Sequence, residues 1–211
     1  MDIAVIDYGM GNLRSVSKAL ERVATGARIS VTSDPAEVGR ADRVVFPGQG
    51  AMPDCMRELD ARGLRPAVLA AARGKPFLGI CIGLQMLFDR SEEGDVAGLG
   101  VFAGQVRRFP HERMVGADGQ RLKVPHMGWN RVATGKPHAM WDGIADGERF
   151  YFVHSYCAEP ADASIVTGRS EYGVPFTCAV ARDNIFAVQF HPEKSQSAGL
   201  RLLTNFTRWN P

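Results

Sequence analysis

The feature that most constrains the fold is a cysteine framed by two glycines at the end of an apolar run. Residues 75–85 read Lys-Pro-Phe-Leu-Gly-Ile-Cys-Ile-Gly-Leu-Gln, with Gly79 two positions before Cys81 and Gly83 two positions after it. This spacing is typical of a nucleophile elbow, a sharp turn from a strand into a helix that exposes one side chain. The sequence therefore predicts a strand up to Cys81, a helix over 82–89, and a thiol that the positive helix end favours as thiolate.

Strand-like and helix-like segments alternate through the first half of the chain. Strands are expected at 3–6, 27–32 and 43–46, and helices at 13–23, 51–62 and 64–73. Asn12 stands where it can cap the first helix, and Asp34-Pro35 is a typical start for a short helix. This alternation predicts an α/β fold with a mostly parallel central sheet flanked by helices.

The second half of the chain has a different pattern, with apolar runs that are short and broken by Gly, Pro and charged residues. Strand-like runs lie at 150–153, 164–167, 177–181 and 185–188. Residues 182–184, Arg-Asp-Asn, are typical of a hairpin turn between the last two runs. We expect an antiparallel extension at one side of the sheet, followed by a helix over 195–208. No repeat or linker divides the chain, so residues 1–211 are expected to form a single domain.

Composition and charge argue against several classes of function. The net charge of the 211 residues is +2 at pH 7, so nothing indicates binding to nucleic acid or to an anionic membrane. Apolar runs fall short of the roughly 20 residues that span a bilayer, and the chain begins without a basic leader. The four cysteines lack the paired spacing of a disulfide framework or zinc site, so we interpret Cys55, Cys157 and Cys178 as packing residues. We expect a cytoplasmic protein with no metal and no cofactor.

A thiol nucleophile needs a base whose own orientation is fixed. His191 directly follows the last strand-like run, and strand ends are the usual place for a site in an open α/β sheet. On a regular strand His191 and Glu193 would point to opposite faces, but Pro192 disfavours a regular strand, and a bend can bring them together. The alternative is that His191-Pro192 only ends the strand. Beside the elbow, we interpret Cys81, His191 and Glu193 as nucleophile, base and orienting carboxylate.

Acyl transfer at Cys81 also requires hydrogen-bond donors for a developing oxyanion. One candidate is the backbone N–H of Ile82, the residue after the nucleophile. The second is Gly50 in the segment Pro-Gly-Gln-Gly at 47–50, because glycine lets a backbone approach a ligand closely. The alternative for this segment is a glycine-rich turn that binds no ligand.

Two of these motifs, Gly-Ile-Cys-Ile-Gly-Leu-Gln at 79–85 and Phe-His-Pro-Glu at 190–193, resemble the class I, or triad, glutamine amidotransferases. Further segments similar to one branch of that family, which supplies ammonia for histidine biosynthesis, lie at 7–15, 125–130, 151–156 and 191–195. The resemblance covers most of the chain. It implies a flavodoxin-like fold and hydrolysis of L-glutamine through a Cys81 thioester. It also implies a heterodimer in which ammonia passes to a cyclase subunit that makes imidazole glycerol phosphate and an aminoimidazole carboxamide ribotide.

The resemblance also gives roles to residues outside the triad. Gln85 and the backbone of Ser155 and Tyr156 match positions that bind the glutamine substrate. The positions that match a cyclase-facing surface are Asn12, Trp129, Asn130 and Lys194.

Each of these assignments has a purely structural alternative. Gln85 could lie on a helix surface, and 155–156 could be a buried strand end. Trp129 could be a core aromatic, and Lys194 could be merely solvated. His126 and His154 lie in the matching segments without a role that the residues themselves indicate, so we interpret them as structural histidines.

Other functions remain open at this point. The chain could feed ammonia to another synthase, such as one for anthranilate or guanylate, although the segments at 7–15 and 125–130 argue against it. It could be a free-standing thiol hydrolase, which would work without a partner. A regulatory subunit that has lost catalysis is the third alternative, and the intact Cys81, His191 and Glu193 argue against it.

Overall fold

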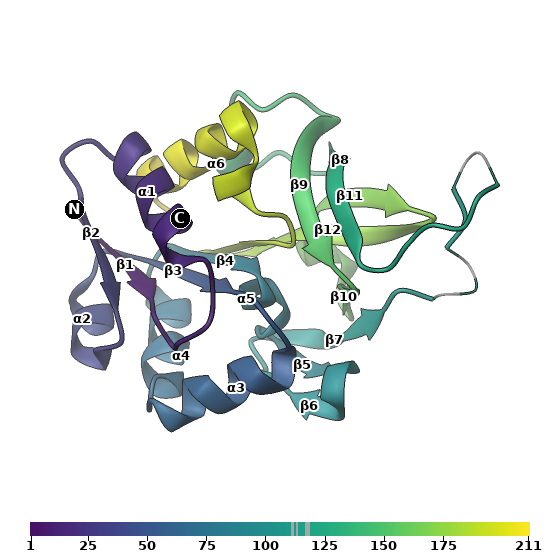
Figure 1. The fold of residues 1–211 in the computed structure, drawn as a ribbon. Helices are drawn as coiled ribbons and strands as arrows, with labels where there is room; N and C mark the ends of the chain where they lie inside the picture. Colours follow the sequence, from purple (N-terminus) through teal and green to yellow (C-terminus); the bar gives the residue numbers. More distant parts are fainter. Residues whose placement is uncertain (111, 113, 117–118) are drawn as a thin grey trace.

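The protein, described by a computed structural model for residues 1–110, 112, 114–116 and 119–211, is built around one continuous sheet (Figure 1). The strand order along the sheet is β2-β1-β3-β4-β13-β12-β10-β7-β5-β6, and β11, β8 and β9 branch from β12. The order places β4, which carries the predicted nucleophile, in the interior of the sheet.

The parallel half of the sheet matches the predicted α/β architecture. Its strands are β1 (Asp2–Ile6), β2 (Arg28–Thr32), β3 (Arg43–Gly48), β4 (Phe77–Cys81) and β13 (Ile185–Val188). The helices are α1 (Leu13–Val23), α2 (Pro35–Arg40), α3 (Met52–Ala61), α4 (Arg65–Gly74), α5 (Ile82–Gln85) and α6 (Gln196–Arg208). Figure 1 shows α1 and α6 on one face of the sheet and α2, α3 and α4 on the other, so both faces of the parallel strands are covered.

The other half of the sheet is mostly antiparallel, as expected. Its strands are β5 (Phe88–Ser91), β6 (Val96–Ala97), β7 (Phe102–Arg108), β8 (His126–Thr134), β9 (Glu148–His154), β10 (Tyr156–Pro160), β11 (Val166–Tyr172) and β12 (Val174–Arg182). The predicted hairpin joins β12 to β13, with Arg182 opposite Ile185. One expectation was wrong in part: β13 pairs antiparallel with β12 but parallel with β4, so it belongs to both halves.

The helix after the elbow is shorter than predicted. The expected helix over 82–89 ends at Gln85, and β5 begins at Phe88. Phe88 pairs with Phe102 of β7, and the two rings lie 5.6 Å apart between centroids. The apolar run therefore continues into the sheet, because a long-range partner rather than local periodicity decides its conformation.

The first helix begins where expected, but its predicted cap was wrong. The Asn12 side chain makes no capping hydrogen bond, and only its backbone carbonyl accepts from the Val16 N–H. Asp34, by contrast, caps α2 by accepting from the Ala36 N–H at 2.9 Å. The start of α1 is therefore held by backbone hydrogen bonds, without a side-chain cap.

The core runs continuously through both halves of the sheet and includes all four cysteines, Cys81 of the elbow and three others. Cys55, Cys157 and Cys178 are buried free thiols, as their interpretation as packing residues requires. Burial raises the pKa of Cys55 to about 11 and that of Cys157 to about 12. These thiols therefore stay protonated at neutral pH, which makes them poor nucleophiles. In the described part of the chain no helix is long and apolar enough to cross a membrane.

Candidate active site

Cys81 occupies the turn between β4 and α5 in a strained conformation. Its φ of 56° and ψ of −111° lie where residues other than glycine cost about 1–3 kcal/mol. The flanking glycines permit the turn: a Cβ on Gly83 would collide with the Phe46 carbonyl oxygen, and one on Gly79 would meet the Ala187 Cβ at 3.0 Å. The predicted nucleophile elbow is therefore present; backbone packing requires glycine at 83, and the space at Gly79 is tight.

His191 and Glu193 lie together at the end of the strand beside the elbow. β13 is the parallel neighbour of β4, with Val188 opposite Ile80, so both strands end at the same edge of the sheet. A short 3₁₀ turn, Pro192–Lys194, then swings Glu193 back, and its Oε1 lies 2.9 Å from His191 Nδ1. The bend predicted at Pro192 is therefore present.

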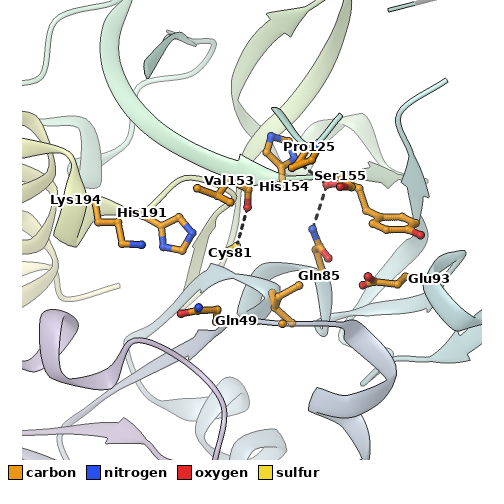
Figure 2. Close-up of a pocket in the computed structure, with 13 residues that line it drawn as sticks. Gln49, Cys81, Gln85, Glu93, Pro125, Val153, His154, Ser155, His191 and Lys194 are labelled. Atoms are coloured by element: carbon orange, nitrogen blue, oxygen red, sulfur yellow. Dashed lines mark hydrogen bonds between the residues drawn. The ribbon is translucent and has the colours of Figure 1, made fainter. Parts of the chain in front are cut away.

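The electrostatics of this pair favour a charged imidazole. Burial lowers the pKa of His191, but the adjacent Cys81 sulfur and the Glu193 carboxylate outweigh burial and raise it to about 10. Glu193 Oε1 hydrogen-bonds to Nδ1, so Nε2 is the ring nitrogen that can interact with the Cys81 sulfur. In Figure 2 the His191 ring points toward Cys81. The arrangement can therefore hold a thiolate–imidazolium pair and pass one proton between the two groups.

A cavity of about 230 Å³ opens over the sulfur. Its lining residues are Gln49, Gly50, Cys81, Ile82, Gln85, Glu93, Pro125, Val153, His154, Ser155, Tyr156, His191 and Lys194. The cavity thus gathers the predicted nucleophile, base, oxyanion donors and substrate-binding residues, while Glu193 lies buried behind His191. Of the predicted cyclase-facing residues, Lys194 lines the cavity, and Asn12, Trp129 and Asn130 do not.

Two glutamine side chains connect the cavity wall to the nucleophile. Gln85 is buried, and its Nε2 donates to the Tyr156 carbonyl at 3.1 Å and to Gln189 Oε1 at 3.0 Å. Gln189 Nε2 in turn lies 3.7 Å from Cys81 Sγ, and the thiol lies 3.9 Å from the Val153 carbonyl. Among the described residues no group bonds to the buried Gln85 Oε1. Gln85 is therefore not the helix-surface residue of the alternative interpretation.

The predicted oxyanion donors come from the start of α5 and from the loop after β3. Ile82 is the first residue of α5, and Gly50 follows β3, which pairs with β4. Gly50 has a φ of +103°, and a Cβ there would meet the Met10 Cε at 2.7 Å. The position requires glycine, and both residues line the cavity. Their roles as donors stay a prediction.

The described residues contain no group of three or more His, Cys, Asp and Glu side chains placed to hold a metal ion.

A comparison with protein families decides the class. The model of the class-I glutamine amidotransferase family matches residues 4–209. The chain belongs to this family. Class I glutamine amidotransferases hydrolyse glutamine, so the chain is an enzyme of that class.

Curated relatives of this amidotransferase are similar over their whole length. The chain is 74% identical to "Imidazole glycerol phosphate synthase subunit HisH" of Dechloromonas aromatica, over 99% of this chain and 97% of that protein. It is 70% identical to the protein of the same name from Aromatoleum aromaticum, over 100% and 99% of the two chains. The protein of that name from Chromobacterium violaceum is 58% identical over 100% and 99%.

Solved structures share the amidotransferase fold at low sequence identity. The structure of PurLQS from Thermotoga maritima superposes with a TM-score of 0.71 at 19% identity, covering 98% of this chain and 97% of that one. A glutamine amidotransferase crystal structure gives the same TM-score at 16% identity, covering 98% and 99%. At these identities the likeness supports the predicted fold and nothing finer.

A second hollow of about 520 Å³ lies beyond the cavity, where β8 meets β11. We term it the groove face; its lining residues are Val115, Gly116, Leu122, His126, Met127, Gly128, Trp129, Asn130, Glu171, Tyr172 and Gly173. Met127 is 62% exposed and Trp129 is 40% exposed. Trp129 is therefore not the core aromatic of the alternative interpretation, and large apolar groups are presented on this side of the amidotransferase.

Tyr151 connects the groove face to the active site. Its ring lies 6.0 Å from the Trp129 ring, and the Lys194 Nζ lies 6.0 Å from its centroid. Lys194 is solvent-exposed but also lines the cavity next to Glu193, so it is more than a solvated lysine. Asn12 precedes α1, which packs against the turn Pro192–Lys194.

Two residues of the amidotransferase site escaped prediction. Gln189 sits in an apolar strand end, where one polar residue before Phe190 was the available signal. Glu93 comes from a 3₁₀ turn after β5, in a region whose strands the sequence pattern did not reveal. Its Oε2 accepts from the Met52 N–H at 2.8 Å, which fixes the carboxylate at the cavity wall.

Proposed function

We propose that Cys81, His191 and Glu193 hydrolyse the side-chain amide of glutamine through a thioester. The observation that carries the proposal is their convergence at one cavity: the sulfur on the elbow, the imidazole on the neighbouring strand end, and the carboxylate 2.9 Å from Nδ1. The curated relatives support the assignment of this chain as the glutaminase subunit of an imidazole glycerol phosphate synthase.

The reaction proceeds in two steps, formation of the thioester and its hydrolysis. The Cys81 thiolate attacks the γ-carbonyl carbon, and the N–H groups of Ile82 and Gly50 stabilise the oxyanion. The carbon–nitrogen bond breaks as His191 donates its Nε2 proton, and ammonia leaves. His191 then takes a proton from water, the hydroxide adds to the thioester, and the carbon–sulfur bond breaks to give the thiolate and a carboxylic acid, which releases its proton to solvent to become glutamate. Glu193 holds the imidazole in one orientation throughout.

Substrate recognition divides among three parts of the cavity wall. Gln85 Oε1, buried and free of other bonds within the described residues, accepts a hydrogen bond from the substrate. The backbone at Ser155 and Tyr156 binds the amino-acid end of glutamine. Glu93 supplies a fixed carboxylate for the α-ammonium group, which the sequence alone did not indicate.

Glu93→Gln should raise KM for glutamine about tenfold, whereas Glu92→Gln, on the exposed neighbour, should not.

We further propose that the ammonia passes to a cyclase subunit bound as a heterodimer partner. The curated relatives are named as one subunit of a synthase, which implies a second. Asn12, Trp129, Asn130 and Lys194 are the proposed partner-facing residues, and the exposed apolar groups of the groove face support this. The partner would make imidazole glycerol phosphate and the aminoimidazole carboxamide ribotide in the cytoplasm. Residues 1–211 would act as a single glutamine amidotransferase domain without a cofactor.

The test measures glutamate release by the pure chain, and then with the cyclase and its nucleotide substrate. The expected result is slow release alone and strong stimulation in the complex. Cys81→Ala should abolish glutamine-dependent synthesis but leave ammonia-dependent synthesis intact, and Cys157→Ala, at a buried thiol outside the cavity, should preserve both. Full glutaminase activity without a partner would instead indicate a free-standing hydrolase. Loss of both activities in Cys81→Ala would contradict the assignment of the nucleophile.

A further inference from the structure

Two buried histidines form a hydrogen-bonded chain that the proposed reaction does not use. The register of β8 and β9 places His126 opposite His154, with His126 Nδ1 3.0 Å from His154 Nε2. His154 Nδ1 lies 2.8 Å from the Tyr156 carbonyl oxygen. At the other end, the Asn130 side-chain nitrogen lies 3.4 Å from His126 Nε2. The chain therefore runs from the groove face to the wall of the active-site cavity.

The end groups fix every donor and acceptor along this chain. A carbonyl oxygen only accepts, so His154 carries its proton on Nδ1 and accepts at Nε2. His126 then donates from Nδ1 and accepts at Nε2 from the Asn130 amide. The second hydrogen of that amide goes to the Glu171 carbonyl at 2.7 Å, and its oxygen accepts from the Arg131 N–H at 2.8 Å. The chain therefore has one direction.

Packing holds both rings neutral. The His126 ring stacks between Tyr172 and Phe152, with centroids 4.0 and 5.0 Å away, and His154 lies 5.0 Å from Phe109. Burial lowers the pKa of His126 to about 4 and that of His154 to about 3. A second proton, on the Nε2 atom of either ring, would also point at a hydrogen-bond donor of the next residue in the chain. The tautomers are therefore fixed at neutral pH.

The chain ends on the carbonyl that orients the substrate-binding glutamine. The Tyr156 oxygen accepts from His154 and from Gln85, and Gln85 bonds to Gln189, which reaches Cys81 Sγ. Figure 2 shows His154 and Ser155 on the side of the cavity above Gln85. A displacement of the Tyr156 carbonyl would therefore move the Gln85 amide and its free oxygen.

We propose that Asn130, His126 and His154 are positioning residues that carry the state of the groove face to the Gln85 amide and so set the affinity for glutamine. The inference rests on the proposed function, in which Gln85 binds substrate and Asn130 faces the cyclase. A contact that shifts the Asn130 amide shifts the relay as a unit, because the His126–His154 link is buried, the links at its two ends are part-buried, and each is satisfied in one direction only. The device needs no proton transfer.

The first test reads the tautomers by NMR of the ¹⁵N-histidine-labelled chain without a partner at pH 7. Both His126 and His154 should carry a proton on Nδ1 alone. Asn130→Asp replaces the donor by an acceptor and should place a proton on His126 Nε2. The matched control is Asn184→Asp, whose amide donates to the Ala72 and Lys75 carbonyls outside the relay, and it should leave both signals unchanged.

The second test measures glutamine kinetics at saturating cyclase. His126→Phe keeps an aromatic ring in the stack but removes two hydrogen bonds, so KM should rise about tenfold with kcat nearly unchanged. His138→Phe is the same substitution at a histidine that packs on Phe186 and Trp209 outside the cavity, and it should leave KM unchanged.

The outcomes separate this inference from the function on which it rests. A wild-type spectrum with a proton on Nε2 of either ring overturns the relay, as does an active complex in which His126→Phe has the wild-type KM. Absence of glutamine turnover by the wild-type complex overturns the proposed function instead, and the spectra then decide the relay alone.

Discussion

His191 and His154 line the same cavity, but their surroundings shift the imidazole pKa in opposite directions. His191 is buried beside the Cys81 sulfur and the Glu193 carboxylate, and its pKa is raised to about 10. His154 is equally buried, but it faces aromatic rings and a neutral carbonyl, and its pKa is lowered to about 3. Burial alone disfavours the charged ring in both places. What differs is the neighbouring negative charge.

One residue type thus serves two purposes in the wall of one cavity. A ring that must accept and return a proton needs a partner that stabilises its charged form, and Glu193 supplies it. A ring that must hold a position gains from being unable to take up a proton, since its hydrogen bonds then keep one direction. The pKa values of these histidines therefore report their different roles.

The largest effect is expected from removing the Glu193 carboxylate, which together with the Cys81 sulfur distinguishes the surroundings of His191 from those of His154. Glu193→Gln should lower the pKa of His191 and reduce kcat for glutamine about a thousandfold, because the imidazolium loses its buried counter-charge. Glutamine turnover by the complex measures this, and ammonia-dependent synthesis should be retained. Glu159→Gln, at an exposed carboxylate paired with Arg107, is the control. A loss smaller than tenfold would mean that Glu193 does not hold the base.

An intermediate effect concerns stability at acid pH. The pKa values of His126 and His154 lie below the ordinary 6.5, so the unfolded chain binds their protons first and the fold loses stability as pH falls from 6.5 toward 4. Each ring contributes a loss on the order of 3 kcal/mol at pH 4. Denaturant unfolding from pH 7 to 4 should therefore show a shallower decline for His126→Phe than for wild type. Parallel curves would contradict the neutral assignment.

The smallest effect tests the aromatic side of the comparison. Tyr172→Ala uncovers one face of His126 and should raise its pKa by about 1, because burial is the cause of the depression. Tyr172→Phe keeps the ring and loses only the bond from the hydroxyl to the Lys123 carbonyl, so it should leave that pKa unchanged. NMR titration reads both variants. An equal shift in the two would mean that the hydroxyl, not the ring, controls His126.

The sequence was sufficient for those parts of the site that depend on local geometry. The elbow follows from the two glycines around Cys81, because their spacing has few other uses. His191 follows from its place at a strand end, and Glu193 from the proline between them. In each case the residues that decide the geometry lie within a few positions of the functional side chain.

The parts that sequence did not reveal depend on pairing between distant segments. The helix over 82–89 was predicted too long because Phe88 has its partner at Phe102. The link between His126 and His154 exists only through the register of β8 and β9. Local patterns carry no information about such a register, so both histidines could only be interpreted as structural.

One consequence follows from the adjacency of β4 and β13. Nucleophile and base leave neighbouring parallel strands, so their separation is inherited from the spacing of about 4.8 Å between paired backbones. A slip of one residue in that pairing would turn every side chain of β13 to the opposite face. A copy with that slipped pairing should therefore lack a base at Cys81 and be inert rather than partly active.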